Sequence, residues 1–219
     1  QVKVLQYVDD ILLCAPTEGI SQEGSKALNL LANSGYKVSK PKAQICQISV
    51  KYLGLVLSEE IRVLSEERIK PIVSFLLAQT LKQLRGLLGI PVFCRLWIPG
   101  YSEIACPFYH LIKEIQAAKT HSLVLEPEAK RAFDQLKQAL LEAPAFSLPI
   151  RKMFNLYVSE KKGMALGVLI QAQDSAHQPI GYLNKELDLV AKELTACLWA
   201  VSAVALMVSE ATNFTMRMT

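Results

Sequence analysis

Apolar and polar residues follow one another in a way that divides the chain into three stretches. In the first stretch, two short apolar runs on either side of Asp9-Asp10 predict a β-hairpin with buried strands and a tight turn. Apolar residues at helical spacing across positions 20–31 predict a helix. Gly35 is suited to end this helix in a left-handed conformation.

The rest of the first stretch is also expected to be short and strand-rich. A brief strand is expected at 36–38, and a proline keeps the following loop at 40–42 out of a helix. Alternating apolar residues from 48 to 64, with a turn at 58–60, predict a second hairpin. Gly54 falls inside a predicted strand, where glycine marks either close approach of another backbone or ligand, or an ordinary β-bulge.

From Ser65 the spacing becomes helical and stays so for about 50 residues. Ser65 is placed to cap a short helix that ends near Ser74, and Thr80 with Gln83 matches a capping box for a second helix. The buried stripe of this second helix is expected to contain Leu81, Leu84, Leu88 and Phe93.

The polar side of the second helix carries Lys82, Arg85 and Arg95. A charged helix face is usually only solvated, but lysine and arginine can instead follow a phosphate backbone. Pro91 stands inside the same helix, where a proline costs about 3 kcal/mol or kinks the helix. Pro99-Gly100 then breaks the pattern before a further helix through residues 109–112.

The third stretch is predicted to begin with a helix whose start contains Glu126-Pro127-Glu128. Proline and acidic residues are both favoured in the first turn of a helix. Its apolar stripe contains Ala129, Phe133, Leu136 and Leu140. Three strands are expected at 154–158, 164–171 and 180–183, with a turn at residues 161–163 between the first two. An apolar run at 194–208 predicts a buried helix. The fold class is therefore α+β.

The composition limits the classes of function that this chain can have. The hydrophobic fraction of 51% and the charged fraction of 20% are those of a globular protein, and the net charge of +4 permits a nucleic-acid partner. Five widely spaced cysteines without a Cys-x-x-Cys pair indicate neither a disulfide framework nor a zinc site, so a reducing, cytoplasmic location is expected. The longest apolar run is shorter than the roughly 20 residues that span a bilayer, so no membrane partner is expected.

The acidic pair is the candidate for chemistry. Neighbouring carboxylates repel each other unless a cation lies between them, and hard oxygen ligands favour Mg²⁺ or Mn²⁺. Such ions support phosphoryl transfer by stabilising the attacking and leaving oxygens. The alternative is an ordinary turn, because Asp tolerates turn geometry and bonds its own backbone.

Several motifs, in order, resemble the polymerase of gammaretrovirus-type reverse transcriptases, such as those in endogenous retroviral Pol polyproteins. The motifs are Tyr7-Val8-Asp9-Asp10, Lys42-Ala43-Gln44-Ile45-Cys46, Val50-Lys51-Tyr52-Leu53-Gly54 and Phe93-Cys94-Arg95-Leu96-Trp97-Ile98-Pro99-Gly100. The resemblance continues through residues 140–145 and 167–171, so it covers nearly the whole chain. It implies the end of a polymerase palm at 1–64, a helical thumb at 65–115 and an incomplete, RNase H-like connection domain at 116–219.

The resemblance also implies roles for individual residues. Asp9 matches the metal-binding carboxylate, with Asp10 beside it, and Lys42 matches the general acid for the leaving pyrophosphate. The residues that match primer and template contacts are Tyr7 and Val8, the primer grip Tyr52, Leu53 and Gly54, and the thumb residues Lys82 and Arg85. Implied partners are an RNA template, a DNA primer, their RNA/DNA hybrid, a deoxynucleoside triphosphate, and other Pol segments.

Departures from the family pattern limit what this chain is expected to do. The chain begins inside a strand at Gln1, which indicates a fragment; the other metal carboxylate and the fingers of the family lie before that point. Without that carboxylate we expect no two-metal catalysis by the isolated chain. Residues 76–78 replace the prolines usual at that joint. Ser159 stands where RNase H relatives carry their first carboxylate, whereas Glu193 has a helical place suited to another.

The resemblance therefore predicts a fragment of an RNA-directed DNA polymerase that is inactive alone, located in the cytoplasm or in a virion core. Two alternatives stay open. One is a non-catalytic module that binds hybrid nucleic acid or another Pol subunit, and the other is an inert remnant. A steep salt dependence of hybrid binding separates a binding module from a remnant.

Overall fold

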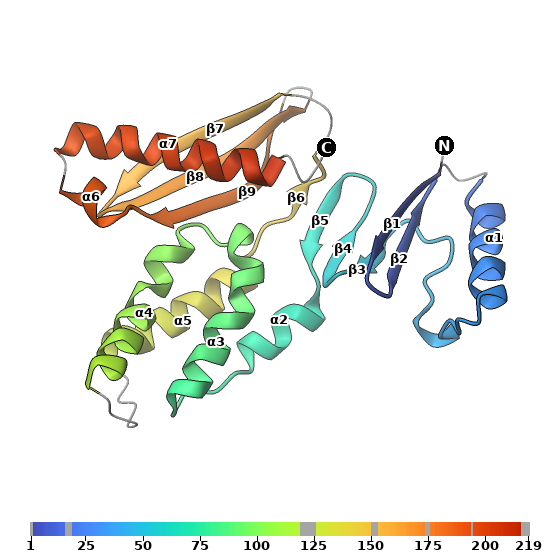
Figure 1. The fold of residues 1–219 in the computed structure, drawn as a ribbon, viewed down its shortest axis with the longest axis horizontal. Coiled ribbons are helices and arrows are strands. Elements are labelled where there is room, and N and C mark those ends of the chain that lie inside the picture. Colours follow the sequence, from blue (N-terminus) through green and yellow to red (C-terminus); the bar gives the residue numbers. More distant parts are fainter. Residues whose placement is uncertain are drawn as a thin grey trace. The chain divides into compact units, whose positions relative to one another are not determined.

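The computed structural model describes residues 2–15, 19–118, 126–149, 153–173, 176–193 and 195–215. The chain divides into two compact units, Gln1–Ser65 and Glu66–Thr219. Figure 1 traces both units from the blue N-terminus to the red C-terminus.

The first unit is built from short strands and one helix (Figure 1). Its elements are β1 Lys3–Tyr7, β2 Asp10–Cys14, α1 Ile20–Asn33, the 3₁₀ turn η1 Lys40–Lys42, β3 Val50–Tyr52, β4 Leu55–Leu57 and β5 Ile61–Leu64. Strands β1 and β2 pair antiparallel, and β4 pairs antiparallel with β3 on one side and β5 on the other. The two predicted hairpins are therefore confirmed.

Helix α1 ends as its sequence predicts. Gly35 has φ +83°, the Gly35 N–H donates to the Ala32 carbonyl at 3.0 Å, and the Tyr36 N–H donates to the Leu31 carbonyl at 2.9 Å. This bonding is the Schellman motif, which satisfies the last carbonyls of a helix. The strand predicted at 36–38 is wrong, because these residues lie in no strand and the Tyr36 N–H is already used to close the helix.

The first hairpin departs from expectation in its burial. Its strands were predicted to be buried, but every residue of β1 is exposed, and Val4 and Leu5 keep 61% and 52% of their surface accessible. Helix α1 contacts β2, which is only partly covered. The apolar pattern therefore specifies the strands correctly, while burial also needs a covering layer that the described part of this unit does not supply.

The turn between β3 and β4 corrects the predicted place of Gly54. Tyr52 pairs with Leu55, so Leu53 and Gly54 form a two-residue turn rather than part of a strand. Their φ angles are +51° and +77°, the signature of a type I′ turn, whose twist matches that of the flanking strands. Glycine suits this backbone conformation, and the β3–β4 register is regular, so the alternative of a β-bulge is wrong. The Gly54 carbonyl accepts from the Ser65 N–H, so another backbone segment does approach it, while the approach of a ligand stays a prediction.

The second unit contains most of the helices. Its elements are α2 Glu66–Val73, α3 Leu81–Cys94, the 3₁₀ turn η2 Arg95–Trp97, α4 Tyr101–Ala118, α5 Pro127–Leu141, β6 Phe146–Ser147, β7 Phe154–Lys161, β8 Met164–Gln173, β9 Ala176–Glu186, α6 Leu189–Lys192 and α7 Ala196–Thr215. Strands β7, β8 and β9 form an antiparallel sheet in that order. The three predicted strands and the α+β class are confirmed.

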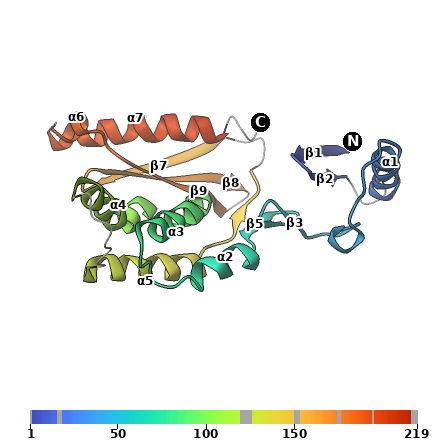
Figure 2. The same ribbon diagram turned by 60° about the horizontal axis from the view of Figure 1, so that its bottom comes forward.

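Helices lie on both faces of this sheet. Helix α7 packs along one face against all three strands, whereas η2 and α4 contact β9, and α5 packs against α4 and α2 (Figure 2). Gly167 on β8 allows the close approach of α7, because an added Cβ would lie 3.1 Å from the Met207 sulfur. The core between sheet and helix includes Ala165, Leu169, Ile180, Leu183, Ala203 and Met207.

Aromatic contacts connect η2 with the sheet. The Trp97 and Phe146 rings stack with centroids 5.4 Å apart, and Phe146 meets Tyr182 edge to face at 5.6 Å. Phe146 has no exposed surface and Trp97 has 2%. Offset and edge-to-face pairs of this kind add about 0.5–1.5 kcal/mol beyond area burial. The three rings therefore join η2, β6 and β9.

The capping box of α3 is confirmed in its main bond. The Gln83 N–H donates to the Thr80 hydroxyl at 3.2 Å, and the Gln83 carboxamide accepts from the Gln79 N–H at 2.8 Å, one residue before the expected donor. Ser65, by contrast, does not cap α2 through its side chain, since its buried hydroxyl finds no hydrogen-bond partner among the residues described. Helix α3 continues through position 91. The side chain of Pro91 lies outside the part of the chain that the structure describes.

The apolar stripe of α3 is largely buried, with one exception. Leu84 and Leu88 have 0% and 4% of their surface exposed, whereas Phe93 has 43% exposed and was wrongly placed in the core. The Arg68 guanidinium carbon instead lies 4.1 Å from the centre of the Phe93 ring. This cation–π contact explains how an aromatic ring is accommodated at the surface.

Helix α7 is also less buried than predicted. Ala203 and Met207 face the sheet with no exposed surface, but the other side of α7 is apolar and exposed at Leu198, Val201, Val204 and Val208. The predicted start at Leu194 lies outside the described residues. Among the helices described, none combines the length and apolar character that crossing a bilayer requires.

Two glycines of the first unit provide a matched test of backbone conformation. At Gly24, inside α1, and at Gly35, beyond its end, an added Cβ meets no atom within 4 Å. Gly24→Ala should stabilise α1 by about 0.5–1 kcal/mol, because alanine loses less entropy in a helix. Gly35→Ala should destabilise it by about 1–2 kcal/mol, because φ is +83° there. Urea unfolding followed by circular dichroism measures both, and shifts of the same sign would contradict this account.

Candidate functional site

The acidic pair lies at the tip of the first hairpin. Tyr7 pairs with Asp10, so Val8 and Asp9 form a two-residue turn, and the Gln6 carboxamide donates to the Val8 carbonyl at 3.2 Å. The predicted placement of both carboxylates at a tight turn is therefore confirmed. Tyr7 and Val8 beside them are 61% and 76% exposed, so the tip is open to a large partner.

The turn holds Val8 in an unusual conformation. Its φ is +53°, a region in which β-branched residues are rarely found, and Asp9 after it does not have positive φ. Positive φ at the first turn position alone is characteristic of type II′ turns, which favour glycine there. Strained backbone of this kind costs about 1–3 kcal/mol and concentrates at functional sites.

The acidic pair alone is an incomplete metal site. Asp9 belongs to the turn and Asp10 begins β2, and successive residues of an extended chain point to opposite sides. Across the ranges that the structure describes, no three His, Cys, Asp or Glu side chains gather where they could hold a metal ion. The residues present therefore do not fit a complete two-metal centre, which needs carboxylates from more than one element.

Lys42 ends the 3₁₀ turn η1 and is exposed. The sequence predicted a loop without helix here, but one turn of 3₁₀ helix forms because Pro41 occupies its first turn, where a missing N–H costs nothing. The Lys42 and Ala43 N–H groups both donate to the Ser39 carbonyl at 3.1 Å. The turn itself is therefore held by its own backbone.

A residue without an assigned role in the sequence, Gln44, connects this turn to β3. Its carboxamide nitrogen donates to the Lys51 carbonyl at 2.7 Å, and its oxygen accepts from the Lys51 N–H at 2.7 Å. Two residues further on, the Cys46 sulfur lies 3.5 Å from the Ser21 hydroxyl on α1. No periodicity marks either contact, so sequence patterns could not have identified them.

The predicted primer-grip residues lie at the β3–β4 turn. Tyr52 ends β3, Leu53 and Gly54 form the turn, and all three are half-buried. The Gly54 carbonyl also accepts from the Ser65 N–H at 3.1 Å, which ties the turn to the end of β5. Tyr52 directly follows Lys51, whose backbone Gln44 binds. The Gln44 contact therefore lies next to the predicted grip.

The predicted thumb cations lie in the second unit. Lys82 and Arg85 are exposed on α3, and Gly86 and Gly89 share their face because positions 82, 85, 86 and 89 recur at helical spacing. An added Cβ at either glycine meets no atom within 4 Å. This face, named here the α3 cation face, therefore combines two positive side chains with open backbone.

The structure brings some of the predicted residues together and leaves others apart. The residues of the acidic turn share one hairpin, and Gln44 links Lys42 to the strand that leads into the predicted grip. The α3 cation face belongs to the other unit. Ser159 is exposed on β7. Glu193 is the C-cap residue after α6 and lies outside both α6 and α7, so its expected place inside a helix is wrong.

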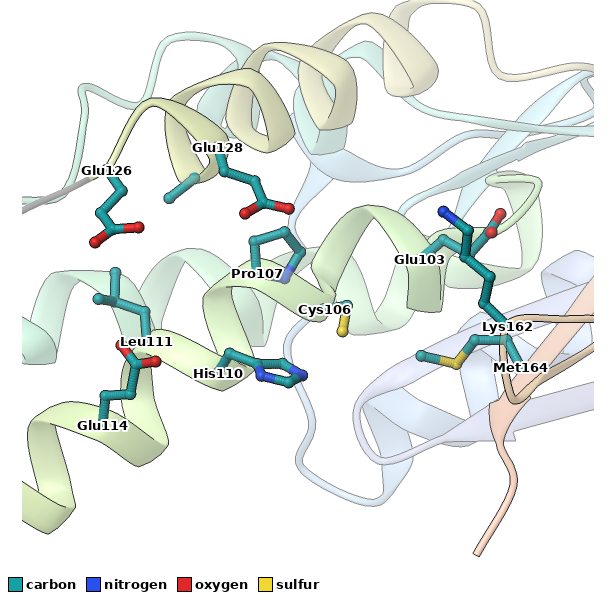
Figure 3. A pocket seen from close by; sticks show the side chains of 11 residues that line it. Glu103, Cys106, Pro107, His110, Leu111, Glu114, Glu126, Glu128, Lys162 and Met164 are labelled. Atoms are coloured by element: carbon teal, nitrogen blue, oxygen red, sulfur yellow. The ribbon is translucent and has the colours of Figure 1, made fainter. Parts of the chain in front are cut away.

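A pocket of about 440 Å³ in the second unit has the opposite charge character (Figure 3). It lies among α4, the start of α5 and the β7–β8 turn, and its lining includes Glu103, Glu114, Glu126 and Glu128. Glu103 is already bound to Lys161 at 3.1 Å. The three remaining glutamates outnumber Lys162, which also lines the pocket, so the charge of this pocket does not favour phosphates.

Comparison with known sequences finds close relatives along the whole chain. Over 218 residues, the chain is 44% identical to the Gag-Pol polyproteins of Woolly monkey sarcoma virus and of Gibbon ape leukemia virus, and 42% identical to the Pol polyprotein of Feline endogenous virus ECE1. These matches include 99% of this chain. The chain spans only 13% of the first two relatives and 20% of the third. No family model matches the chain.

The fold is similar to solved retroviral structures. The foamy viral protease-reverse transcriptase in complex with dsDNA matches with a TM-score of 0.82 over 96% of this chain and 44% of that chain. The same protein in complex with an RNA/DNA hybrid matches with a TM-score of 0.78 over 95% of this chain and 28% of that chain. At 22% identity in both cases, these matches concern the fold.

The conformation of Val8 can be tested by substitution. Val8→Gly should stabilise the first hairpin by about 1 kcal/mol, because glycine adopts positive φ without the side-chain clash. Amide hydrogen exchange at Leu5 and Leu12, the next hydrogen-bonded pair after the closing Tyr7–Asp10 pair, should become slower. Val4→Gly, inside β1, is the matched control and should speed exchange, because glycine weakens a regular strand. Faster exchange in Val8→Gly would show that the turn is not strained.

Proposed function

Because this chain belongs to the retroviral Pol polyproteins, we propose that it is a segment of an RNA-directed DNA polymerase that grips nucleic acid but does not polymerise alone. The proposed layout is the end of the palm at 1–64, the thumb at 65–115 and part of the connection domain at 116–219. The observation that carries the proposal is the identity of 42–44% along the whole chain.

The proposed inactivity follows from the side chains that are present to bind metal ions. Two-metal nucleotidyl transfer stabilises charge on the attacking and leaving oxygens at once, which requires carboxylates that bridge both ions. Asp9 and Asp10 come from a single turn, and no third acidic, histidine or cysteine side chain joins them among the residues described. Mg²⁺ or Mn²⁺ is therefore the proposed cofactor of the parent polymerase, and no step is assigned to it in this chain.

The proposed role of the α3 cation face is to follow a phosphate backbone. Lys82 and Arg85 supply the charges, and the open backbone at Gly86 and Gly89 permits close approach of a sugar-phosphate chain. The proposed ligand is an RNA template paired with a DNA primer, in keeping with the hybrid bound by the foamy viral relative. Recognition of shape and backbone suits a polymerase that must copy every sequence.

In the first unit, the proposed contacts are with the primer end. The exposed Tyr7 and Val8 flank the acidic pair, and the Leu53-Gly54 turn is the proposed grip. Lys42 is the proposed general acid for pyrophosphate in the complete polymerase, with a deoxynucleoside triphosphate as the substrate there. The proposed location is the virion core or the cytoplasm of the host cell.

A second candidate function is binding to another Pol segment. The exposed apolar positions of β1 and of the outer side of α7 favour it, because apolar surface of this kind usually marks an interface. This function is compatible with nucleic-acid binding, since the α3 cation face belongs to a different element. An inert remnant is the third candidate, and no feature of the structure favours it.

Salt-titrated binding of a fluorescent RNA/DNA hybrid tests the proposal. The logarithm of affinity should fall linearly with the logarithm of salt concentration, by about 0.7–0.9 for each phosphate contacted. Lys82→Ala with Arg85→Ala should reduce this slope by the equivalent of about two contacts. Lys130→Ala, at an exposed lysine on α5, is the matched control and should leave the slope unchanged. Binding that does not depend on salt, or no binding, would contradict the proposal.

A further inference from the structure

We propose that Gln44 is a positioning residue that fixes the Lys40–Lys42 turn against the open edge of β3 and thereby holds Lys42 for contact with a phosphate. The proposal rests on the proposed function and extends it, since it assigns Lys42 a contact with the phosphate backbone of the bound hybrid in addition to the general-acid role proposed for the complete polymerase. It adds a residue whose two hydrogen bonds determine where that lysine stands.

The geometry of the contact resembles the pairing of a neighbouring strand. In an antiparallel ladder, one residue offers its N–H and its carbonyl to the same side. Lys51 is the middle residue of β3, and both of its backbone groups are bound by the Gln44 carboxamide at 2.7 Å. The side chain of Gln44 therefore takes the position that the backbone of another strand would occupy.

This contact restricts where Lys42 can lie. Only Ala43 separates Lys42 from Gln44, and two residues of chain span at most about 7 Å between Cα atoms. The backbone bonds of η1 to Ser39 keep the turn itself rigid. Pinning Gln44 to Lys51 therefore pins the whole turn beside the strand that leads into the Leu53-Gly54 turn.

The other end of the segment is also held. Cys46 lies at a bend with φ +50°, and its sulfur lies 3.5 Å from the Ser21 hydroxyl on α1. Residues 43–46 therefore connect α1 with β3, and Gln44 supplies the stronger of the two attachments because it makes two short bonds to backbone.

Glutamine is the side chain that this geometry requires. It offers one donor and one acceptor in a single plane, as a peptide group does. Methionine has a similar length but neither group, and glutamate keeps the acceptor while it loses the donor. A fixed backbone at Lys42 avoids part of the entropy cost of ordering this loop at the moment of binding.

Two variants and one control test the contact itself. Amide hydrogen exchange at the Lys51 N–H should become faster in Gln44→Met, because its acceptor is lost, and should stay slow in Gln44→Glu, which keeps that acceptor. Gln47→Met is the matched control, at an exposed glutamine of the same segment, and should not change it. Unchanged circular dichroism would show that the variants fold. Equal exchange in Gln44→Met and in the unsubstituted chain would overturn the proposal.

A double-substitution cycle tests the positioning role. In salt-titrated hybrid binding, Lys42→Ala should lower the slope by about one phosphate contact, and Gln44→Met should lower it by a similar amount. The two substitutions together should lower it no further, because both remove the same contact. Additive effects would overturn the proposal, since Gln44 would then act independently of Lys42.

The remaining outcomes separate this inference from the proposed function. Hybrid binding that neither Gln44→Met nor Lys42→Ala changes would overturn the inference and leave the proposed function intact. A chain that binds no hybrid at any salt concentration would overturn both.

Discussion

Tight turns with positive φ fix the positions of the acidic pair and of the predicted primer grip. Val8, Leu53 and Lys162 each hold φ between +51° and +53° at the first position of a two-residue turn. At the second and third of these turns a glycine follows, which makes the conformation easy to adopt. At the first turn Asp9 follows instead, so the acidic pair is presented by the most strained of the three hairpins.

The two proposed roles, binding and catalysis, differ in the charged groups that they require. A phosphate backbone can be held by exposed cations alone, and Lys82 and Arg85 on α3 satisfy that condition within one helix. Nucleotidyl transfer by two metals cannot be performed by one acidic turn, because the ions need ligands from several elements. The proposed grip therefore depends on local structure, whereas the proposed chemistry depends on parts of a polymerase that Asp9 and Asp10 do not replace.

Local signals were sufficient to predict much of the fold. The Schellman end of α1, the Thr80–Gln83 cap and the Pro127 start of α5 were correctly predicted, because each depends on a few neighbouring residues. Burial could not be predicted in the same way. Strand β1 and the outer side of α7 have apolar sequences that none of the described residues covers, and no local pattern reveals whether a distant element will cover them.

The candidate site likewise contains features that the local sequence predicted and features that it did not. The turn that carries Asp9 and Asp10 followed from the sequence, while the role assigned to each of these residues stays a prediction. Gln44 was missed because its partner, Lys51, lies seven residues away across an irregular segment in which no periodicity relates the two residues. Gly54 was misplaced because a two-residue turn and a strand interior look alike in an apolar run.

Primer extension on an RNA template measures whether this chain, which we propose to grip nucleic acid, also has the means to polymerise. The chain would be assayed with Mg²⁺ and with Mn²⁺, beside Asp9→Asn. We expect no extended primer with either metal, together with salt-sensitive binding of the same template and primer. Extension that disappears in Asp9→Asn would contradict this expectation, because the chain would then possess a complete metal site.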